Sequence, residues 1–163
     1  MKKIAELRRL ATLTVVMVVV VALLAGSAGA TSPATAVTKT FSFIGKPGSK
    51  TATLLNIDSL LINARCDSSG RPVIFAFTSA NTADILGRIF DGLGRVHILH
   101  NTSFSKKTKG MQLSPTSGDF DATGSLLFES STGAVVTVNL AFDNSTTLGN
   151  QNLCTVFGSF IAT

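Results

Sequence analysis

The residues best suited to chemistry in this chain lie at positions 119–124, where aspartates alternate with other residues ahead of a glycine. Oxygen side chains in this pattern are how a loop wraps a hard cation such as calcium. Asp119, Asp121 and Thr123 match the first half of an EF-hand loop, but Ser130 stands where the bidentate acid belongs. The segment therefore predicts a polar loop that leads into a strand, with a calcium site of non-EF-hand type as the alternative.

Histidine and hydroxyl side chains are the second set that could do chemistry. His97 and His100 are the only histidines. The apolar residues that alternate with them predict a strand, which places the two imidazoles on opposite faces, where they cannot share a metal ion. The G-x-S-x-G elbow that presents a nucleophilic serine is absent. A small secreted hydrolase is thus the alternative function, with Asp119 and Asp121, or His97 and an unidentified serine, as its catalytic groups.

Cys66 and Cys154 are the only cysteines, and each continues an alternating apolar run on what the pattern predicts to be the inner face of a strand. An even number of cysteines in an exported chain predicts a structural disulfide, and the C-x-x-C spacing of a catalytic dithiol is absent. The bridge would close a loop of 89 residues, counted from 66 to 154 inclusive. The chain-entropy model gives about 4 to 5 kcal/mol for such a loop.

The first 30 residues predict a secretory signal peptide. Four basic residues lie within the first nine, an uncharged apolar run follows over residues 10–25, and Ala28 and Ala30 give the small-x-small pattern of a cleavage site. Cleavage would leave Thr31 at the amino terminus of a secreted protein. The alternative is an uncleaved anchor, because a run of 16 residues is slightly shorter than the ~17 to 20 that span a bilayer. The leader would then be the protein's contact with the membrane.

Composition argues against nucleic acid as a partner. The whole chain carries a formal charge of +5, and the leader accounts for four of the basic residues and one acidic residue, which leaves +2. Nucleic-acid binding needs a basic patch on the folded domain. The cluster Lys106, Lys107 and Lys109 is typical of a solvated loop. The chain has 11 Phe but no Trp or Tyr, and we expect the Phe side chains to form core packing rather than a binding platform.

Beyond a short linker at residues 31–36, the segment 37–163 consists of alternating runs separated by turn signals. These runs predict one all-β domain, a β-sandwich or jelly roll of about eight or nine strands. The runs around residues 126–128 and 135–142 flank a Ser-Ser-Thr-Gly turn and predict a hairpin. The other predicted strands cover residues 38–43, 51–55, 59–66, 73–78, 95–100 and 153–162.

One segment departs from this pattern. Ile85, Leu86, Ile89 and Phe90 recur at helical spacing, and a polar residue at position 81 or 82 could cap a first turn. Gly87 argues against a helix. The spacing predicts one short helix near residues 82–90.

These observations lead to one expected function and two alternatives. We expect a secreted, non-enzymatic β-sandwich that acts as a binding or structural module toward an unknown extracellular or cell-envelope partner, without a cofactor. The alternatives are the small secreted hydrolase and a calcium-stabilised extracellular module.

Overall fold

A computed structural model describes residues 35–117, 120–144 and 153–163 of the chain. The predicted leader with Ala28, Ala30 and Thr31, as well as Asp119 of the calcium hypothesis, lies outside these ranges. Within the described ranges, no helix has the length and apolar character needed to cross a bilayer.

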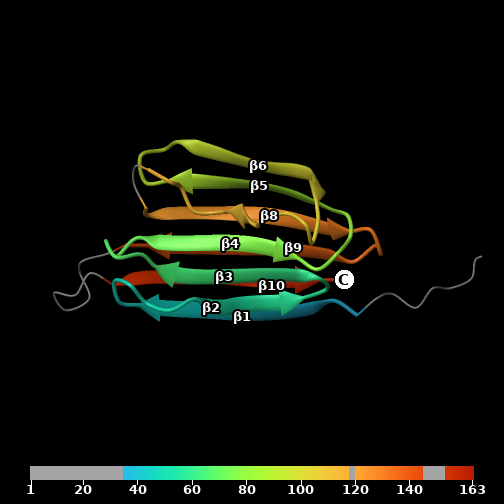
Figure 1. The fold of residues 1–163 in the computed structure, drawn as a ribbon, viewed down its shortest axis with the longest axis horizontal. Helices are drawn as coiled ribbons and strands as arrows, with labels where there is room; N and C mark the ends of the chain where they lie inside the picture. Colours follow the sequence, from blue (N-terminus) through green and yellow to red (C-terminus); the bar gives the residue numbers. More distant parts are fainter. Residues whose placement is uncertain (1–34, 118–119, 145–152) are drawn as a thin grey trace, which may run out of the picture. The chain divides into compact units, whose positions relative to one another are not determined.

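The described residues form ten strands in two antiparallel sheets (Figure 1). The six-stranded sheet has the order β1-β10-β9-β8-β5-β6, and the four-stranded sheet has the order β2-β3-β4-β7. The predicted all-β sandwich is confirmed, with ten strands in place of eight or nine. The strands are β1 (Val37–Gly45), β2 (Ala52–Ile57), β3 (Leu60–Cys66), β4 (Pro72–Thr78), β5 (Ala83–Asp91), β6 (Val96–Phe104), β7 (Met111–Gln112), β8 (Ala122–Ser130), β9 (Val135–Asp143) and β10 (Cys154–Ala162).

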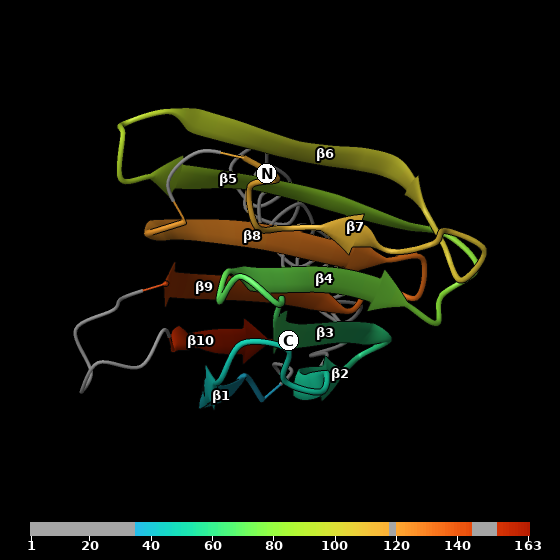
Figure 2. The ribbon, with the colours of Figure 1, turned by 60° about the vertical axis from the view of Figure 1, so that its left-hand side comes forward.

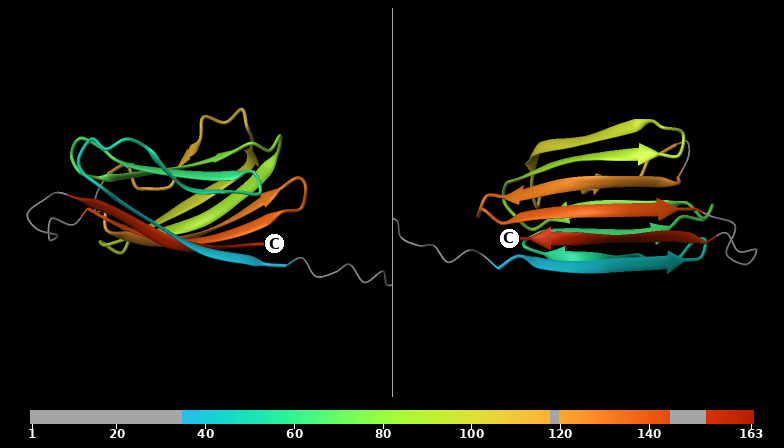
Figure 3. Two further views of the ribbon diagram at one scale, coloured as in Figure 1. Left: turned by 90° about the horizontal axis from the view of Figure 1, so that it is seen from below. Right: turned by 180° about the vertical axis from the view of Figure 1, so that it is seen from behind.

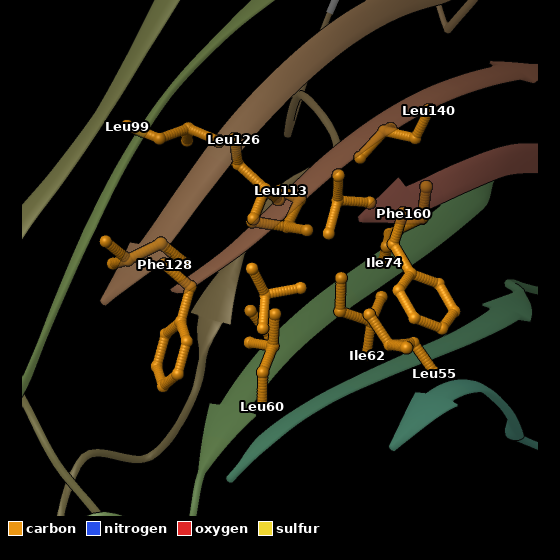
Figure 4. Packing of buried hydrophobic residues seen from close by; sticks show 14 of the residues in the cluster. Leu55, Leu60, Ile62, Ile74, Leu99, Leu113, Leu126, Phe128, Leu140 and Phe160 are labelled. Atoms are coloured by element: carbon orange, nitrogen blue, oxygen red, sulfur yellow. The ribbon is translucent and has the colours of Figure 1, made fainter. Parts of the chain in front are cut away.

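The four-stranded sheet packs face to face on the six-stranded sheet. Figure 2 shows β4, β3 and β2 in front of the six-stranded sheet, and the left-hand view of Figure 3 shows the two layers from the side. The core between them follows from strand alternation, because every second side chain of a strand points to the same face. Phe104, Phe128 and Phe142 are among the largest side chains that are completely buried there. The Phe104 and Phe128 rings meet edge to face, with centroids 6.4 Å apart. Figure 4 shows Leu, Ile and Phe side chains from both sheets meeting in this layer.

The predicted helix near residues 82–90 is wrong, since these residues form β5, which pairs with β6 on one side and β8 on the other. Ile85 and Ile89 are buried, whereas Leu86 and Phe90 point to solvent. Positions i, i+1, i+4 and i+5 fit a helical stripe, but they also fit a strand that carries apolar residues on both faces. Gly87 favours the strand, because a Cβ there would lie 2.8 Å from the Ser125 carbonyl oxygen of β8.

The predicted disulfide is confirmed. Cys66 at the end of β3 bonds to Cys154 at the start of β10, so the bridge joins the two sheets. Both cysteines are buried, and their Cα atoms lie 5.8 Å apart. The turn after β1 closes over the bridge: Ser49 Oγ accepts a hydrogen bond from the Cys66 amide at 3.0 Å. A Cβ at Gly45 would lie only 2.6 Å from Cys66 Sγ, so glycine permits this close approach.

Three hairpins share one five-residue turn. In each, the first amide donates to the fifth carbonyl, and the glycine at position four donates to the first carbonyl. A side-chain oxygen of the first residue accepts from the fifth amide. The glycines have φ of 79°, 78° and 85°, a left-handed conformation that glycine adopts without strain. The turns are 67–71, 91–95 and 130–134, of which the first two share the sequence Asp-x-x-Gly-Arg.

Candidate functional site

The solvent-facing side of the six-stranded sheet, here called the outer face, is unusually apolar. Of the ten large apolar side chains that are exposed in the described part of the chain, eight lie on this face. The right-hand view of Figure 3, which shows the molecule from behind, looks directly onto the six-stranded sheet and its outer face. Its exposed apolar residues are Ile44 of β1, Leu86 and Phe90 of β5, Val96 and Ile98 of β6, Leu127 of β8, and Phe157 and Ile161 of β10.

Strand register gathers these side chains into rows. Leu86 of β5 lies directly beside Leu127 of β8, and Phe90 lies beside Val96 of β6. A second row runs from Phe90 through Thr123 and Ala141 to Phe157, across four adjacent strands. Phe90 is 46% and Phe157 is 53% exposed, so the expectation that Phe serves as core packing fails for these two rings. Monomeric proteins rarely expose large contiguous apolar patches, and such patches commonly mark contact surfaces.

Three depressions in the described part of the chain open onto the outer face. The largest, of about 740 Å³, lies over β1, β10, β9 and β8. Its floor contains the small residues Gly124, Ala141 and Gly158, and a Cβ at Gly158 would lie 2.2 Å from the Asn139 carbonyl oxygen. Phe157 lines it together with hydroxyl groups and the Asn139 side chain. We call it the central trough.

Two further depressions flank the central trough. One of about 470 Å³ lies over β5, β6, β8 and β9 and is lined by Leu86, Ile98 and Leu127, with Arg88 as its charged residue. The other, of about 410 Å³, lies at the strand ends and is lined by three aspartates together with Phe90 and Phe157. Together, the three depressions make a surface that offers apolar walls, hydroxyl groups and a few charges.

Asp121 and Thr123 of the calcium hypothesis lie within the described residues, where a second carboxylate, Asp143, lies near Asp121. Ala122 pairs with Phe142, so Asp121 before β8 and Asp143 at the end of β9 stand opposite each other and line the same depression. Asp121 also accepts a hydrogen bond from the Asn144 amide at 3.4 Å. Thr123 lies on the same face, two residues after Asp121. No group of three or more His, Cys, Asp or Glu arranged to hold a metal occurs among the described residues, and calcium binding stays a prediction.

Asp91 at the end of β5 is a carboxyl group with a strongly lowered pKa. Its side chain has no exposed surface; Oδ1 accepts from the Leu93 and Arg95 amides, and Oδ2 accepts from Arg95 Nε at 2.7 Å. Burial raises its pKa, but the hydrogen bonds from the Arg95 amide and side chain and from His97, with the Arg95 charge, outweigh burial and lower the pKa to about 2. The carboxylate thus serves as the cap of the 91–95 turn.

The hydrolase hypothesis depended in part on His97. Its Nε2 lies 3.3 Å from Asp91 Oδ2, and within the described ranges this carboxylate is its polar partner. No serine hydroxyl completes an Asp-His-Ser arrangement there. His100 lies on the opposite face of β6, beside Leu86, as the strand pattern predicted. The structure therefore separates the two imidazoles and uses one of them in a turn.

The lysine cluster lies in the connection after β6. Lys106, Lys107 and Lys109 are exposed, and the Lys106 amide donates to the Ala80 carbonyl, which holds the connection against the start of β5. This arrangement is the solvated loop that the sequence predicted.

Comparisons with protein-family models, with curated proteins and with solved structures gave no match for this chain. The structure itself defines the class: an antiparallel two-sheet β-sandwich, cross-linked between its sheets by one disulfide, with an apolar and troughed outer face.

Proposed function

We propose that the protein is a secreted binding module that contacts an extracellular or cell-envelope partner through the outer face of its six-stranded sheet. One observation carries this proposal: eight exposed large apolar side chains and three depressions of the described residues share that face. The buried disulfide fits an extracellular protein, since such bonds persist in oxidising compartments.

The chemistry of the central trough favours binding over catalysis. None of its lining residues titrates near neutral pH, and its polar groups are the hydroxyls of Thr40, Ser42, Thr123 and Ser159 and the amide of Asn139. Such groups donate and accept hydrogen bonds, while Phe157 supplies the apolar area that dominates contact energetics. A general acid or base would need a titratable group within hydrogen-bond reach of the reacting atom.

The partner that fits this face best is another protein with an apolar patch. Protein interfaces combine an apolar, Phe-containing centre with a polar rim. Flat rings with a polar handle, which sugar-binding sites commonly use, are missing because the chain has no Trp or Tyr.

Site-specific photocrosslinking tests the proposal. A photoreactive phenylalanine analogue placed at Phe157 of the exported protein should capture a protein partner on intact cells of the source organism. The same analogue at Asn56, which is exposed on β2 of the other sheet, is the matched control and should capture none. Unlabelled wild-type protein should compete for the capture, and protein carrying Phe157→Asp should not. Equal capture at both positions, or competition by the variant, would refute the assignment of the outer face.

A calcium-stabilised module is the second candidate, and the Asp121–Asp143 juxtaposition favours it. Like charges directly opposite each other on a sheet are destabilising, and a bound cation would relieve that repulsion. The two candidates are compatible, because the carboxylates border the outer face. No observation of the described residues favours the hydrolase over either of them.

A further inference from the structure

The β6 edge of the six-stranded sheet has the features of a strand that accepts another strand. Among the described strands, β6 pairs with β5 alone, so one of its two sides is open. Its nine residues, Val-His-Ile-Leu-His-Asn-Thr-Ser-Phe, include no Lys, Arg, Asp, Glu or Pro. Edge strands are normally protected against pairing by such residues, by bulges or by being short.

The other sheet edges carry that protection. β1 includes Lys39 and lies alongside β2 of the other sheet (Figures 1 and 3). β2 is interrupted by a register shift between Thr53 and Leu55, and β7 has two residues. β6 has one register shift of its own, where Ala83 and Ile85 of β5 pair with Phe104 and Asn101, but its residues 96–101 pair without interruption. Over that stretch β6 is therefore the long, uncharged and regular edge of the described fold.

The backbone of β6 offers its free hydrogen-bonding groups in an alternating pattern. The Asp91 amide donates to the Arg95 carbonyl, which makes 91 and 95 a hydrogen-bonded pair. In an antiparallel ladder every second pair is hydrogen-bonded, so His97 and Leu99 direct their amides and carbonyls toward β5. Val96, Ile98 and His100 direct theirs away from the sheet. The same three residues place their side chains on the outer face.

We propose that a second copy of this chain occupies that edge, with the two β6 strands antiparallel and Ile98 paired with Ile98 of the partner copy. This register places Val96 of each copy beside His100 of the other. The side-chain rows then continue across the two-fold axis: Phe90 and Val96 of one copy adjoin His100 and Leu86 of the other. A twelve-stranded sheet results, with one continuous outer face.

The apolar content and charge of β6 favour a copy over an unrelated strand. A two-fold interface must be complementary to itself, and an uncharged strand brings no like charges together at its own axis. Ile98 is 63% exposed and becomes flanked by its equivalent, so the more exposed of the two exposed apolar side chains of β6 gains the most from pairing. Arg88, the charged neighbour of Ile98, stays one strand behind β6 in each copy and does not face its equivalent across the axis.

The proposed dimer contact is small, because it consists of one strand pair and its flanking side chains. Stable interfaces bury roughly 800 Å² per partner, and one strand pair with its flanking side chains falls below that size. We therefore expect a reversible dimer that depends on protein concentration, measured by sedimentation velocity over a dilution series. Ile98→Lys should weaken the association by at least about tenfold, equivalent to ~1.4 kcal/mol. Ile44→Lys, at a side chain 66% exposed on the β1 edge, is the matched control and should leave the association unchanged.

Cysteine cross-linking tests the register. Hydrogen-bonded antiparallel pairs have Cα atoms about 5.5 Å apart, within the range that a disulfide spans. Ile98→Cys should therefore form a covalent dimer on mild oxidation, and a mixture of Val96→Cys with His100→Cys protein should form a heterodimer. His100→Cys alone should not, because four residues of offset separate its equivalents by roughly 14 Å along the strands.

Each result of these experiments either supports or overturns the β6 dimer. Cross-linking of Ile98→Cys, together with concentration-dependent sedimentation lost in Ile98→Lys, supports the dimer. A monomer at all concentrations with no cross-link at Ile98→Cys overturns it, and so does preferential cross-linking of His100→Cys. Far-UV circular dichroism of each variant, compared with that of Ile44→Lys, shows whether the fold is retained. The result is independent of the photocrosslinking at Phe157, which lies on β10 and tests the outer-face partner.

Discussion

Reduction of the Cys66–Cys154 disulfide is the most informative perturbation of the fold. The bridge joins the end of β3 to the start of β10 and spans a sequence separation of 88 residues. In the chain-entropy model, closing a loop of this length removes enough freedom from the unfolded chain to stabilise the folded state by ~4.6 kcal/mol at 25 °C. Since whole domains are stable by only about 5 to 15 kcal/mol, this one bond would supply a large share.

The assay is urea denaturation of the oxidised and the reduced protein. The chain has no Trp or Tyr, so the transition is followed by far-UV circular dichroism rather than by intrinsic fluorescence. With a denaturant slope of ~2 kcal/mol per molar urea, the loss of ~4.6 kcal/mol lowers the midpoint by about 2 M. The slope itself should rise on reduction, because the uncrosslinked chain exposes more surface when it unfolds.

Ser49→Ala provides the matched control for this experiment. The variant keeps the disulfide but removes the hydroxyl that accepts the Cys66 amide hydrogen bond, a local loss of about 1 kcal/mol. The large effect should therefore follow the covalent bond and not the packing around it. A midpoint shift on reduction no larger than that of Ser49→Ala would refute the argument that the bridge acts by restricting the unfolded chain.

Two further predictions concern carboxylates. In the fold, the pKa of Asp91 is lowered from 3.8 to about 2. Its ionised form therefore stabilises the folded state at pH values above the unfolded-state pKa of 3.8. This stabilisation is lost as the pH falls from about 4 to 2. Urea midpoints of wild type and Asp91→Asn should differ at pH 7 and converge toward pH 2, whereas a constant difference would contradict the hydrogen-bonding account. Calcium should raise the melting temperature of wild type, by an amount corresponding to about 2.7 kcal/mol at 100 times its dissociation constant, and should not raise that of Asp121→Asn/Asp143→Asn. Equal melting of wild type with calcium and with chelator would remove the calcium hypothesis.

Local alternation was enough to predict most of the fold. The runs that end in Cys66 and begin at Cys154 were assigned to inner strand faces, and both cysteines are buried there and bonded to each other. Alternation failed over residues 82–90, because Ile85, Leu86, Ile89 and Phe90 satisfy the helical period and the strand period together. Tertiary pairing of β5 between β6 and β8 decides between the two, and that pairing is set by residues far along the chain.

The candidate site was harder to predict from the sequence, because a row of side chains across a sheet consists of residues that are distant in the chain. Phe90 and Phe157 belong to one row only through Thr123 and Ala141, and the order β10-β9-β8-β5 is needed to see it. The position of Asp143 opposite Asp121 could have been predicted from the sequence. In a hairpin whose turn covers residues 130–134, each residue before the turn pairs with the one equally far after it, which brings Asp143 opposite Asp121.

The apolar residues that misled the helix assignment are the same residues that define the outer face. A strand buried on one side needs a single apolar set, and for β5 that set is Ile85 and Ile89. Leu86 and Phe90 add little to the free energy of folding, because a side chain that stays half exposed removes little apolar area from water. Their contribution can become large only when another surface covers them. We therefore propose that the apolar second face serves a contact beyond the isolated domain, and the outer face and the adjoining β6 edge are the places to test for a partner.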